Sequence, residues 1–431
     1  MRHPLTVNLG NFLLSISDAL DLVSPQLNQH QLRVSFIAWE IGKAARLSDD
    51  MIETLFIASL LHDIGALSLD ERLLLHRFED MESHEHCLVG EALLQGISWT
   101  RSAAPVVKNH HRKWVEWDKP IDEDVVTQSQ IVMLADHLDR LVDRSRFILH
   151  QYKDLTTQIL SLAGDYLHPQ IVDCFASLAK REEFWLDLVS PRLFSLILLH
   201  GPYRKLEIDL VNMLSISRLF KNIIDSRTRF TATHSSGVAA CSQILSRIFG
   251  LTETEIQLME IAGDLHDLGK LAVPNSILNK QGGLTKEEAE IMKSHTYFTY
   301  SVLSAISGFE QIAEWSAYHH ERLDGSGYPF HRRGEEISTG ARILMVADLF
   351  TALAENRPYR KGMERKEITE ILSNFADKEL HDRKIVRLVI ENYQDIHGYM
   401  AEEQANALIF YEKQFQFMAP AGKPGECTGE L

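Results

Sequence analysis

The sequence predicts an all-α protein made of two tandem helical domains. Apolar residues recur at three- and four-residue steps, as in 255–268, which is the spacing of an amphipathic helix, whereas the alternating pattern of a strand is rare. The 23 glycines and 12 prolines gather mainly at a few expected connections. The order of the histidines repeats in the two halves of the chain, which predicts one helical unit used twice.

The glycine and proline clusters place the connections between these helices. Gly201-Pro202 falls between the two repeats, Gly282-Gly283 and 325–329 fall inside the second, and a run rich in both residues ends the chain. We expect a first domain over 1–203, a second domain over 204–412 and a disordered tail over 413–431.

Composition narrows the class of protein. The 431 residues, 45% hydrophobic and 24% charged, suffice for two domains with a core each. A net charge of −16 argues against binding of a nucleic-acid polymer, which needs a basic face. No stretch approaches the roughly 18 uninterrupted apolar residues of a membrane span, and no signal peptide is evident. We therefore expect a cytoplasmic protein with reduced thiols, since its four cysteines are widely separated: Cys87, Cys174, Cys241 and Cys427.

Matching residues align the two halves. The run Leu-Ser-Ile-Ser at 14–17 recurs at 214–217, and in both halves a His-Asp pair follows the first histidine by 32 residues, on what reads as a buried apolar helix. In both halves 24 residues then separate a single histidine from a His-His pair. The first series is His30, His62, Asp63, His86, His110, His111 and Asp136; the second is His234, His266, Asp267, His295, His319, His320 and Asp348.

These residue types point to metal chemistry. Neutral imidazole and carboxylate suit borderline divalent metals, and an aspartate between two histidine groups can bridge two ions. Two ions a few Å apart hold a bridging hydroxide at neutral pH and neutralise the charge that develops on a phosphoryl group. The ligand types therefore predict metal-dependent hydrolysis of a phosphate ester.

The pattern resembles a known family. A helical His-Asp pair with an upstream histidine and a downstream aspartate is similar to the HD superfamily of metal-dependent phosphohydrolases. The second half resembles the HD-GYP phosphodiesterases over about 225–400, because it contains His-Asp-Leu-Gly-Lys at 266–270, His-His-Glu-Arg-Leu-Asp-Gly-Ser-Gly-Tyr-Pro at 319–329 and Arg-Pro-Tyr-Arg at 357–360. The resemblance implies two HD-type domains and hydrolysis of a cyclic dinucleotide second messenger of bacterial signalling, cyclic di-GMP or 3′,3′-cyclic GMP-AMP.

Carried over by position, the resemblance implies two ions, iron, manganese or similar, in the second domain. One site would use His234, His266, Asp267 and Asp348, and the other His295, His319 and His320, with Asp267 shared. Lys270 and Asp267 would be catalytic, and substrate contacts would come from Arg357, Arg360, Tyr328, Gly327 and Asp324. No third ion is expected, because Phe230 stands four residues before the first histidine, where three-metal relatives have a glutamate.

The first domain has every matching ligand position but lacks the residues that would hold the substrate. Its candidate second metal site is His30, His62, Asp63, His86, His110, His111 and Asp136. Ala66 replaces the lysine, Gln26 matches Phe230, and neither the Gly-Tyr-Pro segment nor the Arg-Pro-Tyr-Arg segment has a counterpart. One hypothesis is removal of the 5′-phosphate from a linear dinucleotide product; the alternative is a regulatory or structural metal domain.

The preferred interpretation is an enzyme that opens a cyclic dinucleotide to a linear one. One alternative is a catalytically weak receptor that signals through a partner protein, although the complete ligand set and Lys270 count against it. Another is a mononucleotide phosphohydrolase, against which the 325–329 segment and the two downstream arginines count. The preferred cyclic dinucleotide, the native metal and a homodimer through apolar segments such as 194–199 stay open.

Overall fold

The fold is described from a computed structural model, over residues 6–21, 28–66, 85–117, 123–203, 205–226, 233–280, 282–356 and 361–415. Phe230, Gln26, Arg357, Arg360 and most of the expected tail lie outside these ranges. Within them the protein is helical apart from one two-stranded antiparallel sheet, so the predicted all-α class is confirmed. None of the described helices combines the length and the apolar character that crossing a bilayer requires.

The first half is a series of helices whose buried residues belong to a hydrophobic core that continues into the second half. Strand β1 (Val7–Asn8) and helix α1 (Leu9–Asp21) come first. They are followed by α2 (His30–Ala44), α3 (Asp49–Leu60), α5 (Glu85–Gln95), α6 (Ala104–Lys108), η1 (Trp114–Glu116), α7 (Glu123–Leu141), η2 (Ile148–His150), α8 (Tyr152–Leu160), α9 (Pro169–Leu178), α10 (Glu182–Leu188) and α11 (Leu193–His200). Ser48 starts α3, where its hydroxyl accepts a hydrogen bond from the backbone N–H of Met51.

The second half repeats this order and extends it. Its elements are β2 (Glu207–Ile208), α12 (Leu210–Ser226), α13 (His234–Phe249), α14 (Glu253–Leu265), η3 (Leu268–Ala272), α15 (Asn275–Leu278), α16 (Lys286–Ser304), α17 (Glu310–Ala317), η4 (Tyr318–His320), η5 (Gly334–Glu336), α18 (Thr339–Ala354), α19 (Arg365–Asp377), α20 (Arg383–Glu391) and α21 (Tyr393–Phe415). Capping boxes begin α14, with Thr252 and Glu255, and α16, with Thr285 and Glu288.

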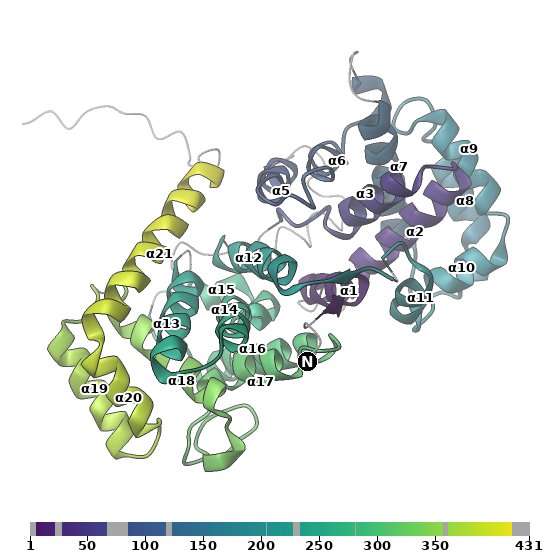
Figure 1. Ribbon diagram of the computed structural model, residues 1–431. Coiled ribbons are helices and arrows are strands. Elements are labelled where there is room, and N and C mark those ends of the chain that lie inside the picture. Colours follow the sequence, from purple (N-terminus) through teal and green to yellow (C-terminus); the bar gives the residue numbers. More distant parts are fainter. Residues whose placement is uncertain are drawn as a thin grey trace, which may run out of the picture.

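The two halves form two lobes, with α1 and α12 near their junction (Figure 1). Strand β1 pairs with β2 so that Val7 faces Ile208 and Asn8 faces Glu207. Helix α1 contacts α2 and α11 of its own half and also η3 and α16 of the other half. Helix α12 likewise contacts α13, α14 and η3 of its own half and α5 of the first. Each leading helix therefore belongs to both lobes.

The His-Asp pairs lie just beyond the ends of helices, which corrects the expectation that they lie on a helix. Helix α3 ends at Leu60, with one residue between it and His62, and α14 ends at Leu265, directly before His266. The chain must turn here because the following glycine packs against another backbone: a Cβ on Gly269 would lie 1.9 Å from the carbonyl oxygen of His295. A continued straight helix would not bring the pair beside that histidine.

Candidate metal centres and substrate cavity

The second-domain histidines and aspartates come together from separate elements. His234 begins α13, His266 and Asp267 follow α14, His295 lies in α16, and Asp348 lies in α18. His319 and His320 form the end of η4. Three groups of donor atoms, each within 4.8 Å of one another, could hold a metal ion: His234, His266 and Asp348; His266, Asp267 and His319; and His295, His319 and His320.

Asp267 lies between the two groups of histidines. Its Oδ2 is 3.2 Å from Nε2 of His266, while its Oδ1 is 3.5 Å from Nε2 of His295 and 4.0 Å from Nε2 of His319. The carboxylate therefore presents one oxygen to each group. This is the arrangement that a carboxylate needs to bridge two ions.

Backbone carbonyls orient the imidazoles. The Nδ1 atoms of His266, His295 and His319 each donate to the carbonyl oxygen three residues earlier, at 2.7, 2.6 and 2.6 Å. A carbonyl only accepts hydrogen bonds, so the proton lies on Nδ1 and the lone pair of Nε2 is available to a metal. His234 is held instead by Glu355, whose Oε2 is 3.1 Å from Nδ1.

Charge separates the histidines into two kinds. Burial opposes protonation of His234, but the carboxylates of Glu355 and Asp348 overcome it and raise its pKa to about 10. Burial lowers the pKa of His295 to about 3, with the partial opposition of Asp267. Burial and the neighbouring imidazoles also lower the pKa of His319. The His295 and His319 imidazoles are therefore neutral, the form that binds metal.

A cavity of about 450 Å³ opens beside this cluster. It is lined by His319, His320 and Asp348 and by Gly327 and Tyr328, two of the expected substrate contacts. Asp324 is exposed and does not line it; its Oδ1 accepts a hydrogen bond from the backbone N–H of Ser326, 2.9 Å away, so it shapes the turn. Lys270 lies next to the bridging carboxylate, with Nζ 2.5 Å from Oδ2 of Asp267.

Several cavity residues were missed from the sequence. Lys293, Arg322, Phe375 and His381 also line the cavity, and the Phe375 and His381 rings stack with centroids 5.1 Å apart. No spacing rule links 375–381 to the histidines, so only the tertiary structure could reveal this platform. Aromatic faces and cations together suit a ligand with bases and phosphates.

Glu321 was also missed, although it follows the His-His pair directly. Glu321 is 1% exposed. Its carboxylate accepts hydrogen bonds from the backbone N–H groups of Phe330, His331 and Arg332 at 2.7, 3.1 and 3.1 Å. It thereby holds the chain after Pro329 against the cluster. The signal that could have revealed it is an acidic residue next to a loop, because loop N–H groups that lack helix or strand partners need an acceptor.

The first domain assembles the matching residues in a similar way. Oδ2 of Asp63 is 3.3 Å from Nε2 of His62, and its Oδ1 is 3.8 Å from Nε2 of both His86 and His110. This Oδ1 atom is buried and has no hydrogen-bond partner. Nδ1 of His62 donates to the carbonyl oxygen of Ser59 at 2.8 Å. A buried orphan oxygen among imidazoles fits a cation.

Two differences from the second domain lie beside the first-domain cluster. Ala66 stands in the place of Lys270 and is fully buried. Arg140, one turn after Asp136, forms an ion pair with that carboxylate through two nitrogens. Burial opposes ionisation of Asp136, but Arg140 and His62 hold its pKa well below the usual range. The sequence comparison missed Arg140 because the matching residue in the second domain is Ala352.

Comparisons with known proteins agree with this architecture. Two family models, both described as HD domain, match the chain, one at residues 28–141 and the other at residues 218–385. The chain is 28% identical over 403 residues to 3′3′-cGAMP-specific phosphodiesterase 1 of Vibrio cholerae, covering 91% of this chain and 93% of that one. It is 40% identical over 150 residues to a cyclic di-GMP phosphodiesterase response regulator of Xanthomonas campestris, covering 34% and 39%.

A solved structure has the same fold. The crystal structure of a cyclic GMP-AMP-specific phosphodiesterase of Vibrio cholerae matches with a TM-score of 0.62 at 22% identity, covering 94% of this chain and 98% of that one. Two HD domains in tandem thus define the class of protein. The chain therefore belongs to the HD-domain proteins, with one HD domain in each half. HD-domain phosphohydrolases are metal-dependent, and the clusters above are its candidate metal centres.

Proposed function

We propose that this protein is a metal-dependent phosphodiesterase that opens a cyclic dinucleotide to a linear one in its second domain. The observation that carries the proposal is the position of Asp267, with one oxygen toward each histidine group and Lys270 at 2.5 Å. The cavity beside His320 and Asp348 supports it, because its aromatic and cationic lining suits bases and phosphates.

The proposed centre holds two ions in the second domain. His234, His266 and Asp348 would hold one and His295, His319 and His320 the other, with Asp267 shared. When bound, such a pair supplies an activated water and neutralises charge on the phosphoryl group. Iron or manganese suits these nitrogen and oxygen donors.

The chain's own residues place the phosphate. The Lys270 ammonium, 19% exposed, lies where it reaches a phosphate oxygen or the leaving oxygen near Asp267. Tyr328, with its ring 5.0 Å from that of His320, closes one side of the cavity. Contacts of Arg357 and Arg360 with phosphate remain part of the proposal and fall outside the described residues.

We propose 3′,3′-cyclic GMP-AMP as the preferred substrate. Two relatives named for this compound match over 91% and 83% of the chain, whereas a relative named for cyclic di-GMP matches over 34%.

A substrate panel tests this function. Metal-loaded wild-type protein is incubated with 3′,3′-cyclic GMP-AMP and with cyclic di-GMP, and the products are separated by chromatography. We expect linear product from both, faster from the mixed dinucleotide, and a loss of more than about 10³-fold in Asp267→Ala. Binding without turnover by wild type would indicate a receptor instead.

The panel also tests removal of the 5′-phosphate by the first domain. If that domain performs this step, Asp63→Ala opens the ring at the normal rate and accumulates the linear phosphorylated product. Ala66 and the ion pair between Arg140 and Asp136 count against this step, because they remove one phosphate contact and engage one metal-ligand carboxylate. An unchanged product pattern in Asp63→Ala would exclude it.

A further inference from the structure

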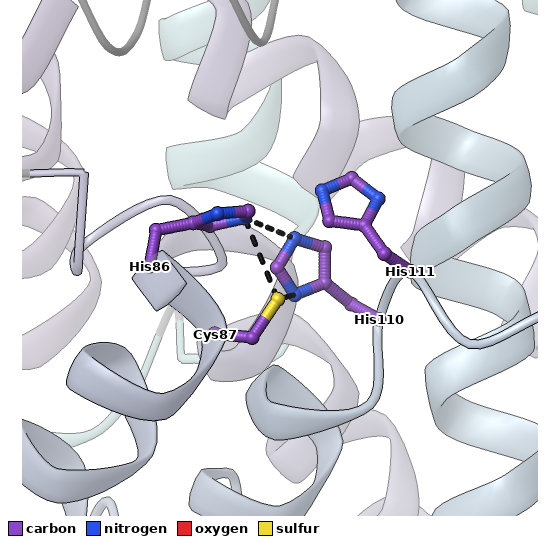
Figure 2. A group of neighbouring side chains, drawn as sticks. All are labelled: His86, Cys87, His110 and His111. Atoms are coloured by element: carbon purple, nitrogen blue, oxygen red, sulfur yellow. Dashed lines mark hydrogen bonds between the residues drawn. The ribbon is translucent and has the colours of Figure 1, made fainter. Parts of the chain in front are cut away.

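A cysteine joins one histidine group of the first domain. Cys87 lies next to His86 in α5, and its Sγ is 3.5 Å from Nε2 of His86 and 3.7 Å from Nδ1 of His110. Figure 2 shows the thiol directed at both rings, with His111 beside them. One donor atom from each of the four residues lies within 4.8 Å of the others.

The distances match the edges of a tetrahedral zinc site. Zn–N bonds of about 2.0–2.1 Å and a Zn–S bond of about 2.3 Å place two nitrogens about 3.4 Å apart and a nitrogen and a sulfur about 3.6 Å apart. The Nε2 atoms of His86 and His110 are 3.4 Å apart, and Sγ of Cys87 is 3.5 Å from the first of them. One ion could therefore contact the sulfur and both Nε2 atoms, while Nδ1 of His110 keeps its hydrogen bond to the carbonyl oxygen of Val107.

Among the described residues of the second domain, no cysteine joins the corresponding group of histidines. The residue that matches Cys87 is Thr296, which is fully buried and donates its hydroxyl to the carbonyl oxygen of Lys293 at 2.9 Å. Nε2 of His295 and Nε2 of His319 are 3.2 Å apart, close to the spacing in the first domain. The two histidine groups thus differ chiefly by the fourth donor.

The other half of the first-domain cluster already has a cation. Arg140 engages both oxygens of Asp136, whereas Asp348 faces His234 at 3.2 Å and His320 at 3.8 Å. A guanidinium on Asp136 supplies the positive charge that an ion between His30, His62 and Asp136 would otherwise supply. This favours a single ion, at the cysteine end.

We infer that the first domain holds one Zn²⁺-like ion on three imidazoles and one thiolate: His86, His110, His111 and Cys87. The thiol proton leaves to solvent when the metal binds, and the sulfur becomes an anionic ligand. Thiolate ligands shift preference from iron or manganese toward zinc. Four protein ligands of these types are the set of a structural zinc site, so we expect the ion to stabilise the domain, with the carboxylate of Asp63 beside it. The inference rests on the expectation, drawn from the sequence, that the first domain binds metal.

A single-thiol protein provides the test. In the full chain Cys174, Cys241 and Cys427 are replaced by Ser, so Cys87 is the only thiol among the four cysteines. The protein is loaded with Co²⁺ for absorption spectroscopy and with Zn²⁺ for X-ray absorption. We expect a sulfur-to-cobalt charge-transfer band in the near ultraviolet and one sulfur at about 2.3 Å from part of the zinc. Cys87→Thr, which copies the second domain, should remove both signals and weaken zinc binding at one site by about tenfold or more.

The outcomes separate the two proposals. A band that persists in Cys87→Thr, or its absence from a single-thiol protein that binds zinc in both domains, would overturn the thiolate ligand while leaving metal binding intact. Zinc bound only in the second domain, shown by no loss of metal in His110→Ala, would overturn both. Circular dichroism of Cys87→Thr and Cys87→Ser checks that both variants are folded. Loss of the cobalt band in both folded variants then supports Cys87 as a ligand.

Discussion

Five imidazoles across the two domains share one local device, a hydrogen bond from Nδ1 to the carbonyl three residues earlier. It occurs at His62 and His110 in the first domain and at His266, His295 and His319 in the second. The bond fixes the tautomer and aims Nε2 inward, so a metal would meet rings that are already oriented. Such orientation lowers the entropic cost of binding.

At the residue scale, substitution of Lys270 tests its proposed catalytic role separately from metal binding. Its ammonium pairs with Asp267 and has a side chain 19% exposed, so it can reach an incoming phosphate. We expect Lys270→Ala to lower the turnover number by about 10²–10³-fold while the metal content stays unchanged. Steady-state kinetics and metal analysis check both parts.

Lys280 provides a matched control for this substitution. It pairs with Glu288 at 2.5 Å near the start of α16 and does not line the cavity. Lys280→Ala should leave turnover within about twofold, because a surface ion pair contributes little. Loss of metal in Lys270→Ala would show that the lysine supports the centre structurally.

At the scale of elements, a glycine lets two segments meet in each domain. A Cβ on Gly65 would lie 2.0 Å from the carbonyl oxygen of His86, and a Cβ on Gly269 1.9 Å from that of His295. The turn after α14 therefore presses directly on the backbone of α16, which carries a candidate metal ligand. This contact sets the distance between Asp267 and His295.

Gly269→Ala should separate these elements. The backbone must move because no flexible side chain can absorb the overlap, and we expect a loss of about 1–3 kcal/mol in the free energy of unfolding, together with loss of metal and activity. Chemical denaturation and metal analysis measure both. Gly283→Ala, where a Cβ meets no atom within 4 Å, is the control and should change neither. A stable, metal-loaded Gly269→Ala would contradict the role of the contact.

At the scale of the whole molecule, the two halves pack as a dimer joined in one chain. With the 200-residue offset, Val7 corresponds to Glu207 and Ile208 corresponds to Asn8. The pair Val7–Ile208 is therefore equivalent to the pair Glu207–Asn8, and the small sheet has an approximate two-fold axis. Contacts of α1 with α16 and of α12 with α5 are related in the same way. The helices that carry His295 and His86 are thus each supported by the other half.

Phe12 tests this mutual support. It is fully buried in α1, and its ring centroid is 5.0 Å from that of Phe309, which precedes α17. Phe12→Ala should cost about 3–5 kcal/mol in the free energy of unfolding and lower second-domain activity, although it lies in the first half. Val211→Ala on α12, where the side chain is exposed, should have little effect. A normal unfolding curve for Phe12→Ala would show that the lobes are independent.

The sequence by itself determined the helical class, the duplication and the set of matched histidines and aspartates. These are local or countable properties: helical periodicity, fixed spacing and residue type. The five hydrogen bonds from histidine Nδ1 to the carbonyl three residues earlier are also local contacts, although the sequence pattern did not reveal them. The same local reading placed the His-Asp pairs on a helix, because apolar residues continue through a turn that only packing against α16 requires.

Only the tertiary structure decided which residues outside the repeat join the clusters. Cys87 and Arg140 have no counterpart at the matching positions of the second half, and Phe375 and His381 come from α19 and the connection after it. Their positions depend on how helices cross, which is fixed by many weak contacts summed over the core. For the same reason the sequence showed two matching sets of candidate ligands that differ by the lysine, whereas only the structure shows that Arg140 and a thiol join the first set.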